Sequence, residues 1–111
     1  MAIRQYDIYL VTLDPTVGSE IKKTRPCVVI SPDEMNGLRT VIIAPLTSKG
    51  FDYLFRPKIR FQEKEGLVLL DQIRTVDKRR LVKKVGRVDT AKAKEIAETL
   101  VEMFAWNGER K

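Results

Sequence analysis

The sequence contains no histidine and a single cysteine, Cys27. Without histidine, a Ser-His-Asp triad, a paired-histidine nuclease site and any zinc site with a histidine ligand are excluded. One thiol cannot form an intramolecular disulfide or a four-thiolate zinc site. Cys27 lies in the apolar run 26–30, where a small core residue is expected rather than a nucleophile. We therefore expect no metal, no cofactor and no thiol chemistry.

Long hydrophobic runs are also missing. No apolar stretch approaches the roughly 20 residues that cross a bilayer, and the first seven residues lack the apolar segment of a secretory signal. These absences predict a cytoplasmic protein without a membrane partner. A chain of 111 residues, of which 43% are hydrophobic and 32% charged, predicts one folded domain over residues 1–111.

Positive charge is in excess and unevenly distributed. The net charge is +6, and the sequence pI is about 9.6. Eight bases against three acids give residues 21–60 a charge of +5, and seven bases against three acids give residues 71–90 a charge of +4. Such clustering is typical of proteins that bind a polyanion or an acidic protein, although a solvated surface has the same composition.

Hydrophobic patterning predicts a mainly β protein with one C-terminal helix. Strands are expected at 6–13, 26–30, 40–46, 53–61, 66–73 and 81–88, with 26–30 buried on both faces and Pro45 marking a sheet edge or bulge. A helix is expected to begin at Asp89 or Thr90 and to close at Asn107-Gly108. Its apolar stripe is expected to be core: Ile96, Ala97, Leu100, Val101 and Phe104. The order predicts a small antiparallel barrel or half-barrel.

Two polar segments follow or precede the expected strands. Arg25 comes directly before Pro26, which restricts it to extended conformations, and its planar guanidinium fits phosphate oxygens. The segment 47–50, Thr-Ser-Lys-Gly, could cradle a phosphate. Taken alone, each segment is better explained without a ligand, Arg25 by pairing with a carboxylate and 47–50 by an ordinary turn.

A third polar segment ends the apolar run 66–70. Asp71 and Gln72 must find hydrogen-bond partners there, so they either brace a site or contact a nucleobase edge. A structural network, with Asp71 paired to an arginine, is the alternative.

Together these segments resemble a known family. The runs at 7–11, 13–20 and 24–32 are similar to the N-terminal signature of PemK/MazF toxins, and those at 45–48 and 70–77 resemble its second and third blocks in the same order. Tyr6 stands where the family usually has a glycine. Ser19 stands where some relatives have a histidine, so an acid–base role of that histidine does not transfer.

The resemblance implies the small SH3-like barrel with a C-terminal helix known as the PemK/MazF/CcdB-like fold, and a homodimer. It also implies the toxin of a toxin–antitoxin pair, an mRNA interferase. Such an enzyme is a sequence-specific, metal-independent endoribonuclease that cleaves single-stranded RNA by attack of the 2′-OH on the adjacent phosphate. The partners implied are single-stranded RNA and a cognate antitoxin.

The family's catalytic positions match Arg25 and Thr47. Arg25 is expected to stabilise the phosphorane oxygens, and Thr47 to bond the phosphate or the 2′-OH. Glu20 is the nearest candidate in sequence for the general base that accepts the 2′-OH proton. Ser19 and Gln72 are candidates for recognition of the RNA nucleobase. The full set expected to bind RNA is Ser19, Glu20, Lys22, Lys23, Ser48, Lys49, Gln72 and Arg74. An acidic antitoxin segment is expected in the same groove, along Lys22, Lys23, Arg25, Lys49, Arg74 and Arg79.

Two alternatives do without catalysis. A gyrase-poison type of toxin shares this barrel and would act on a protein through its C-terminal helix. A single-stranded RNA-binding barrel would need exposed aromatic residues. The eight aromatic residues fall mostly at positions expected to be buried, which disfavours the RNA-binding barrel.

Overall fold

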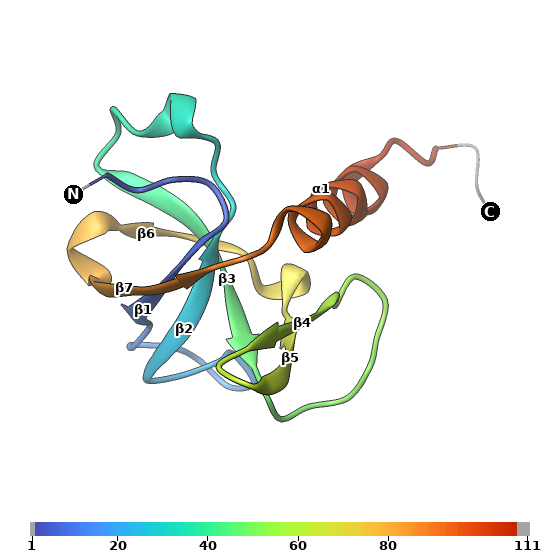
Figure 1. The fold of residues 1–111 in the computed structure, drawn as a ribbon, viewed down its shortest axis with the longest axis horizontal. Helices are drawn as coiled ribbons and strands as arrows, with labels where there is room; N and C mark the ends of the chain where they lie inside the picture. The colour runs from blue at the N-terminus through green and yellow to red at the C-terminus, as the bar shows by residue number, and fades with distance from the viewer. Residues whose placement is uncertain (1, 109–111) are drawn as a thin grey trace.

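The computed structural model describes residues 2–108, and within them the chain forms seven strands, three 3-10 turns and one α-helix (Figure 1). The strands are β1 (Asp7–Thr12), β2 (Thr24–Val29), β3 (Thr40–Thr47), β4 (Lys58–Phe61), β5 (Lys64–Val68), β6 (Arg74–Asp77) and β7 (Leu81–Arg87). The turns are η1 (Asp33–Met35), η2 (Leu70–Gln72) and η3 (Lys78–Arg80), and the helix is α1 (Thr90–Phe104).

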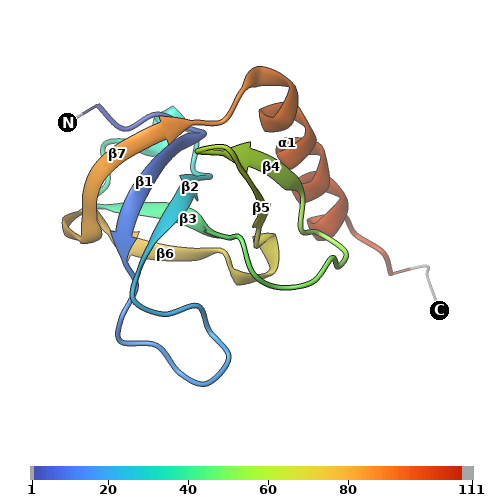
Figure 2. The same cartoon turned by 60° about the horizontal axis from the view of Figure 1, so that its bottom comes forward.

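All strand pairs are antiparallel, in the order β4-β5-β3-β2-β1-β7. Strand β3 is central: β2 pairs with one of its edges, while β6 and then β5 share the other. The sheet curls into a half-barrel that β7 closes on one side, with α1 beyond its end (Figure 2). The mainly β architecture with a C-terminal helix was predicted correctly.

Pro45 does not lie at a sheet edge, so that expectation is wrong. It sits within central strand β3, at the point where pairing with β6 ends at Ile43 and pairing with β5 begins at Leu46. Its carbonyl accepts a hydrogen bond of 2.8 Å from the Leu69 N–H on this shared edge. The N–H and C=O of a strand residue point to the same edge, so the Pro45 nitrogen also faces the edge that β6 and β5 share. It lies where neither strand is paired with β3, and the lack of an N–H donor there breaks no ladder hydrogen bond.

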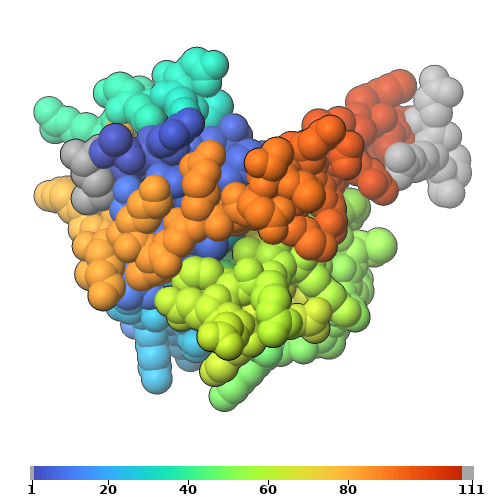
Figure 3. Space-filling model, viewed as in Figure 1, coloured from blue at the N-terminus to red at the C-terminus, as the bar shows by residue number. Residues whose placement is uncertain are grey.

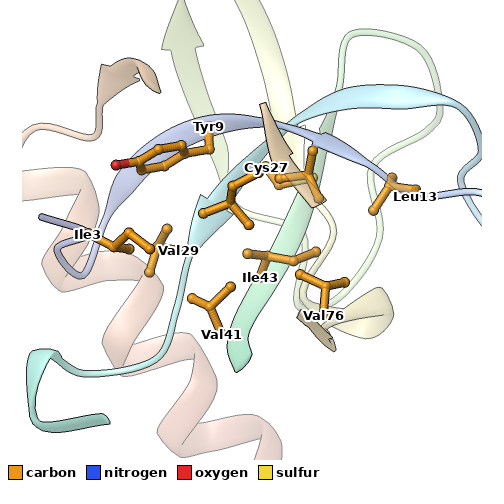
Figure 4. Close-up of a cluster of buried hydrophobic side chains, with 10 residues drawn as sticks. Ile3, Tyr9, Leu13, Cys27, Val29, Val41, Ile43 and Val76 are labelled. Carbon is orange, nitrogen blue, oxygen red and sulfur yellow. The ribbon is translucent and has the colours of Figure 1, made fainter. Parts of the chain in front are cut away.

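The second half of β2 is buried on both faces, as the continuous apolar run 26–30 predicted. Alternate side chains of β1, β2 and β3 fill the inside of the barrel, among them Tyr9, Val29 and Ile43 (Figure 4). The intervening side chains, such as Val28, pack under α1 and the β4–β5 hairpin. Cys27 is fully buried in the barrel, and burial raises the pKa of its thiol to about 12. Its role as a core residue was predicted correctly.

Two predicted strands differ from the structure. The strand expected at 53–61 is confined to β4, because Phe55 has a φ of 65° and breaks the extended run. The strand expected at 66–73 ends at Val68 and gives way to η2. Strand β6 was not predicted at all, since Val76 is its only apolar residue and leaves no alternating pattern to detect.

Helix α1 begins as predicted, with the Asp89 carboxylate accepting a hydrogen bond of 2.9 Å from the Lys92 N–H. It ends at Phe104, short of Asn107-Gly108. The predicted stripe is only partly core: Ile96 is buried and Leu100 packs against the core, whereas Val101 and Phe104 are 72% and 66% exposed. The side of α1 that meets the core instead includes Ala93 and Met103, so Val101 and Phe104 lie outside the packed side, on a helix whose end projects from the sheet (Figures 1 and 3).

The aromatic residues are more exposed than the sequence indicated. Phe51, Tyr53, Phe104 and Trp106 all rank among the exposed large side chains. The expectation that most aromatics are buried is therefore wrong for half of the eight. Among residues 2–108, no helix is long and apolar enough to cross a membrane.

Candidate active site

Strand register brings Arg25 and Thr47 together. Strands β2 and β3 pair Val29 with Ile43 and Cys27 with Pro45. Continued by two residues, this register places Arg25 opposite Thr47. Both residues line one open pocket of about 190 Å³, together with Ser48 and the β4–β5 hairpin. The two predicted catalytic residues therefore share a site.

The Arg25 guanidinium is largely uncommitted. Arg25 is exposed, and its Nε donates one hydrogen bond of 3.2 Å to the Lys22 carbonyl. Within residues 2–108 the Arg25 side chain forms no ion pair and no further hydrogen bond, so pairing with a carboxylate does not explain it. The bond to Lys22 orients the fork, and both terminal nitrogens keep their N–H groups for an anion.

The Thr47 hydroxyl is already partly used by its own loop. Its Oγ1 donates to the Lys49 carbonyl at 2.8 Å and accepts from the Lys49 N–H at 3.1 Å. A hydroxyl has one donor and two acceptor positions, so one lone pair remains. In this geometry Thr47 can accept from a ligand O–H and cannot donate to a phosphate oxygen. The expected contact with a 2′-OH fits, and the expected contact with phosphate would require Thr47 to release Lys49.

The β4–β5 hairpin forms the opposite wall of the pocket through Gln62, Lys64 and Glu65. Sequence reasoning missed this wall, because polar residues at a strand turn look like an ordinary solvated turn. Gln62 and Glu63 have φ values of 51° and 64°, and both therefore adopt left-handed backbone conformations. In two-residue strand turns these positions are usually occupied by Asn-Gly. Glu65 places a carboxylate in the pocket that holds Arg25 and Thr47.

The pocket continues into a second hollow of about 200 Å³ at the base of the β3–β4 loop. Thr47, Ser48 and Glu65 line both hollows, and Asp52 and Lys58 line only the second. Lys58 Nζ lies 3.1 Å from Asp52 Oδ2, and this contact raises the pKa of the lysine. Ser48 thus stands between the two hollows, and Lys49 is exposed beside it.

Other predicted RNA-binding residues lie elsewhere around the β1–β2 loop. Glu20, Gln72 and Arg74 line a separate pocket of about 250 Å³. Gln72 Oε1 accepts from the Ile21 N–H at 2.9 Å, and Arg74 donates to the Leu13 carbonyl at 3.1 Å, so both hold this loop in place. The remaining three, Ser19, Lys22 and Lys23, are exposed on the loop.

Two further charged residues have structural partners. Asp71 is paired with an arginine, as the alternative interpretation had it: Arg56 Nε and Nη2 each donate to it at 2.9 Å. These bonds hold the pKa of Asp71 below its usual range. Arg79 pairs with Asp77 at 3.0 Å on η3, at the end of the molecule remote from the β4–β5 hairpin (Figures 1 and 2).

The chain is similar to known toxins and endoribonucleases over most of its length. The model of the family described as PemK-like, MazF-like toxin of type II toxin-antitoxin system matches residues 4–104. Endoribonuclease EndoA of Bacillus subtilis (strain 168) is 32% identical over 107 residues, which cover 90% of this chain and 92% of that protein.

Solved structures share the fold. MazF from Deinococcus radiodurans superposes with a TM-score of 0.82 at 23% identity, covering 96% of this chain and 99% of that one. An endoribonuclease in complex with its cognate antitoxin, from a mycobacterial species, gives 0.78 at 20% identity, covering 96% and 100%. A MazE–MazF structure from D. radiodurans gives 0.77 at 22% identity, covering 96% and 99%. The sequence, matched over nearly all of its length, belongs to the PemK-like and MazF-like toxins of type II toxin–antitoxin systems.

Proposed function

We propose that this toxin is an endoribonuclease that cleaves single-stranded RNA, using the substrate's own 2′-OH as nucleophile and no metal ion. Membership of the toxin family and the 32% identity to EndoA support the activity. The observation that carries the proposal is the uncommitted Arg25 guanidinium beside the Thr47 hydroxyl in one pocket.

The chemistry needs alignment and charge stabilisation. The 2′-OH attacks the adjacent phosphorus, its proton leaves to a base, and the 5′-oxygen departs with a proton. Arg25 donates hydrogen bonds to the non-bridging oxygens, whose charge grows in the phosphorane. Thr47 accepts from the 2′-OH through its remaining lone pair and so orients the nucleophile. Glu65 supplies the carboxylate of this pocket, whereas Glu20 lies in the neighbouring one.

Incubation of the purified protein with a long single-stranded RNA in excess EDTA tests this function. Cleavage at defined positions is expected, and a duplex of the same sequence should stay intact. Binding without cleavage would instead identify a non-catalytic RNA-binding barrel. Neither binding nor cleavage would identify a toxin that acts on a protein.

We further propose that the antitoxin partner competes with RNA for the groove around Arg25. The solved relatives include toxins in complex with their antitoxins. Lys22 and Lys23 are exposed on the β1–β2 loop just before Arg25, whose Nε donates to the Lys22 carbonyl, and they offer positive charge to either ligand. An acidic segment that folds as it binds would place carboxylates where phosphates lie.

Reversing both charges, Lys22→Glu with Lys23→Glu, is expected to weaken RNA and antitoxin binding together, by about tenfold or more at low salt. Arg39→Glu, at an exposed arginine before β3, is compared with each single reversal, Lys22→Glu or Lys23→Glu, as the control of equal charge change. A saturating antitoxin peptide should displace labelled RNA in an anisotropy titration. Unchanged RNA affinity in its presence would place the two ligands at separate sites.

A homodimer would explain the exposed half of helix α1. Val101 and Phe104 present apolar surface that nothing in residues 2–108 covers, next to Trp106, which is 81% exposed. Burial of such a patch against a second copy would extend the groove and join the basic regions of both chains. Phe104→Asp is expected to convert a dimer to a monomer in sedimentation, with Lys94→Asp as control. A wild-type protein that is monomeric at micromolar concentration and fully active would contradict this.

A further inference from the structure

We propose that Phe51 and Tyr53, on the β3–β4 loop, form a platform on which an unpaired base of the RNA stacks, next to the phosphate held by Arg25 and Thr47. This inference rests on the proposed ribonuclease function and adds a binding subsite to it. Neither residue takes part in the chemistry described above.

The two rings are exposed although they are held in place. Phe51 and Tyr53 are 67% and 66% exposed, and their ring centroids lie 6.0 Å apart in an edge-to-face arrangement with an interplanar angle of 80°. Large aromatic side chains leave water when the fold offers them a place, so two ordered rings on a surface indicate a binding partner.

Arg56 supports the rings from one side. Its guanidinium carbon lies 5.2 Å from the Phe51 centroid and 5.9 Å from the Tyr53 centroid, within the range of cation–π attraction. Arg56 is itself fixed by the two hydrogen bonds of 2.9 Å to Asp71 on η2. The loop is therefore anchored to the body of the protein beneath the rings, and a preorganised platform loses little entropy on binding.

The platform is continuous with the candidate active site. The loop leaves β3 directly after Thr47, and its base lines the hollow that opens into the Arg25 pocket (Figure 1, green loop). Phe51 is four residues from Thr47, so their Cα atoms are at most about 14 Å apart. A nucleotide adjacent to the scissile phosphate lies within this range.

The chemistry of the surroundings favours a nucleobase over an apolar protein anchor. The hollow at the base of the same loop is lined mainly by polar groups, including Ser48 and the paired Asp52 and Lys58, and the rings stand on the loop that borders it. A base offers a flat face for stacking and polar edges for such groups, whereas a buried aliphatic anchor would leave them unpaired. Stacking on aromatic rings is also the usual way in which proteins hold unpaired bases.

The test uses a single-stranded RNA with a 2′-O-methyl group at the mapped cleavage position, which blocks the attack, and 2-aminopurine at one flanking position at a time. Wild-type protein should quench the fluorescence at one flanking position. Phe51→Ala and Tyr53→Ala should each abolish that quenching and weaken RNA affinity roughly 5- to 150-fold, whereas Tyr53→Phe should retain both. Because both rings are exposed, the unfolding midpoint should not change.

Leu54→Ala is the matched control. Leu54 lies in the same loop and is 69% exposed, but it has no ring. Its RNA affinity should stay within about twofold of wild type if stacking is what matters. An equal loss for Leu54→Ala and Phe51→Ala would overturn the platform in favour of a general apolar surface. Unchanged RNA affinity in both ring variants, with weaker antitoxin binding or self-association, would overturn it in favour of a protein-docking site.

A result that refutes the proposed ribonuclease function can be distinguished from one that refutes the platform. Wild-type protein would then leave unmodified RNA intact, whatever the ring variants do. In that case 2-aminopurine is moved along the unmodified RNA one position at a time, and position-specific quenching by wild type, lost in Phe51→Ala, would still support the platform as a binding subsite. Normal cleavage with no quenching at any flanking position would overturn the platform alone.

Discussion

Arg25→Ala is expected to lower kcat/KM for RNA cleavage by about 10³-fold, because removal of one preorganised donor to a developing oxyanion has an effect of this size. The Arg25 side chain makes one hydrogen bond, to the Lys22 carbonyl, and is exposed. The free energy of unfolding should therefore change by no more than about 0.5 kcal/mol. Initial rates with a doubly labelled RNA and a urea titration of the same preparation measure the two effects.

Arg25→Lys separates charge from geometry. Lysine keeps the positive charge but lacks the planar fork that donates two parallel hydrogen bonds. We expect kcat/KM of Arg25→Lys to exceed that of Arg25→Ala by no more than about tenfold, because the ammonium group would regain a single charge-assisted hydrogen bond. Arg39→Ala, at an exposed arginine outside the site, controls for net charge. Wild-type rates in Arg25→Ala would exclude the mechanism.

Thr47→Ala is expected to lower kcat/KM about 10²-fold, for two connected reasons. The substitution removes the acceptor that orients the 2′-OH, and it removes both hydrogen bonds to the Lys49 backbone. The second loss releases the start of the β3–β4 loop, so substrate affinity should fall together with the rate.

Thr47→Ser keeps the hydroxyl and should retain activity within about fivefold of wild type, whereas Thr47→Val keeps the shape alone and should behave like Thr47→Ala. Steady-state measurement of kcat/KM for Thr47→Ala, Thr47→Ser and Thr47→Val separates the effect of the hydroxyl from that of side-chain shape. If Thr47→Val were as active as wild type, the hydroxyl would have no part in catalysis.

The sequence was sufficient where local chemistry determines structure. The Asp89 cap, the burial of Cys27 and the two-faced burial of β2 follow from residues close together in the chain. The candidate pair Arg25 and Thr47 came from resemblance, and strand register explains how two residues so far apart in the chain come to line one pocket.

What could not be predicted depends on contacts between distant segments. Glu65 enters the pocket because β5 pairs with the end of β3, and a polar turn carries no sign of that. Gln72 and Arg74 turned out to hold the β1–β2 loop, an interaction that spans more than fifty residues. The exposed members of the α1 stripe, Val101 and Phe104, show the same limit, since helical periodicity indicates which residues share a face but not which side of that face the core covers.

The division of one β3 edge between two partners has a consequence for motion. The β4–β5 hairpin is joined to β3 by two residue pairs, whereas β6 is joined by four. Local opening should therefore cost less free energy at the hairpin than in the barrel, and amide hydrogens of β4 should exchange before those of β2. Since the hairpin is one wall of the pocket, the same local opening would widen the site while the barrel stays closed, so the site could adapt its width without loss of the fold.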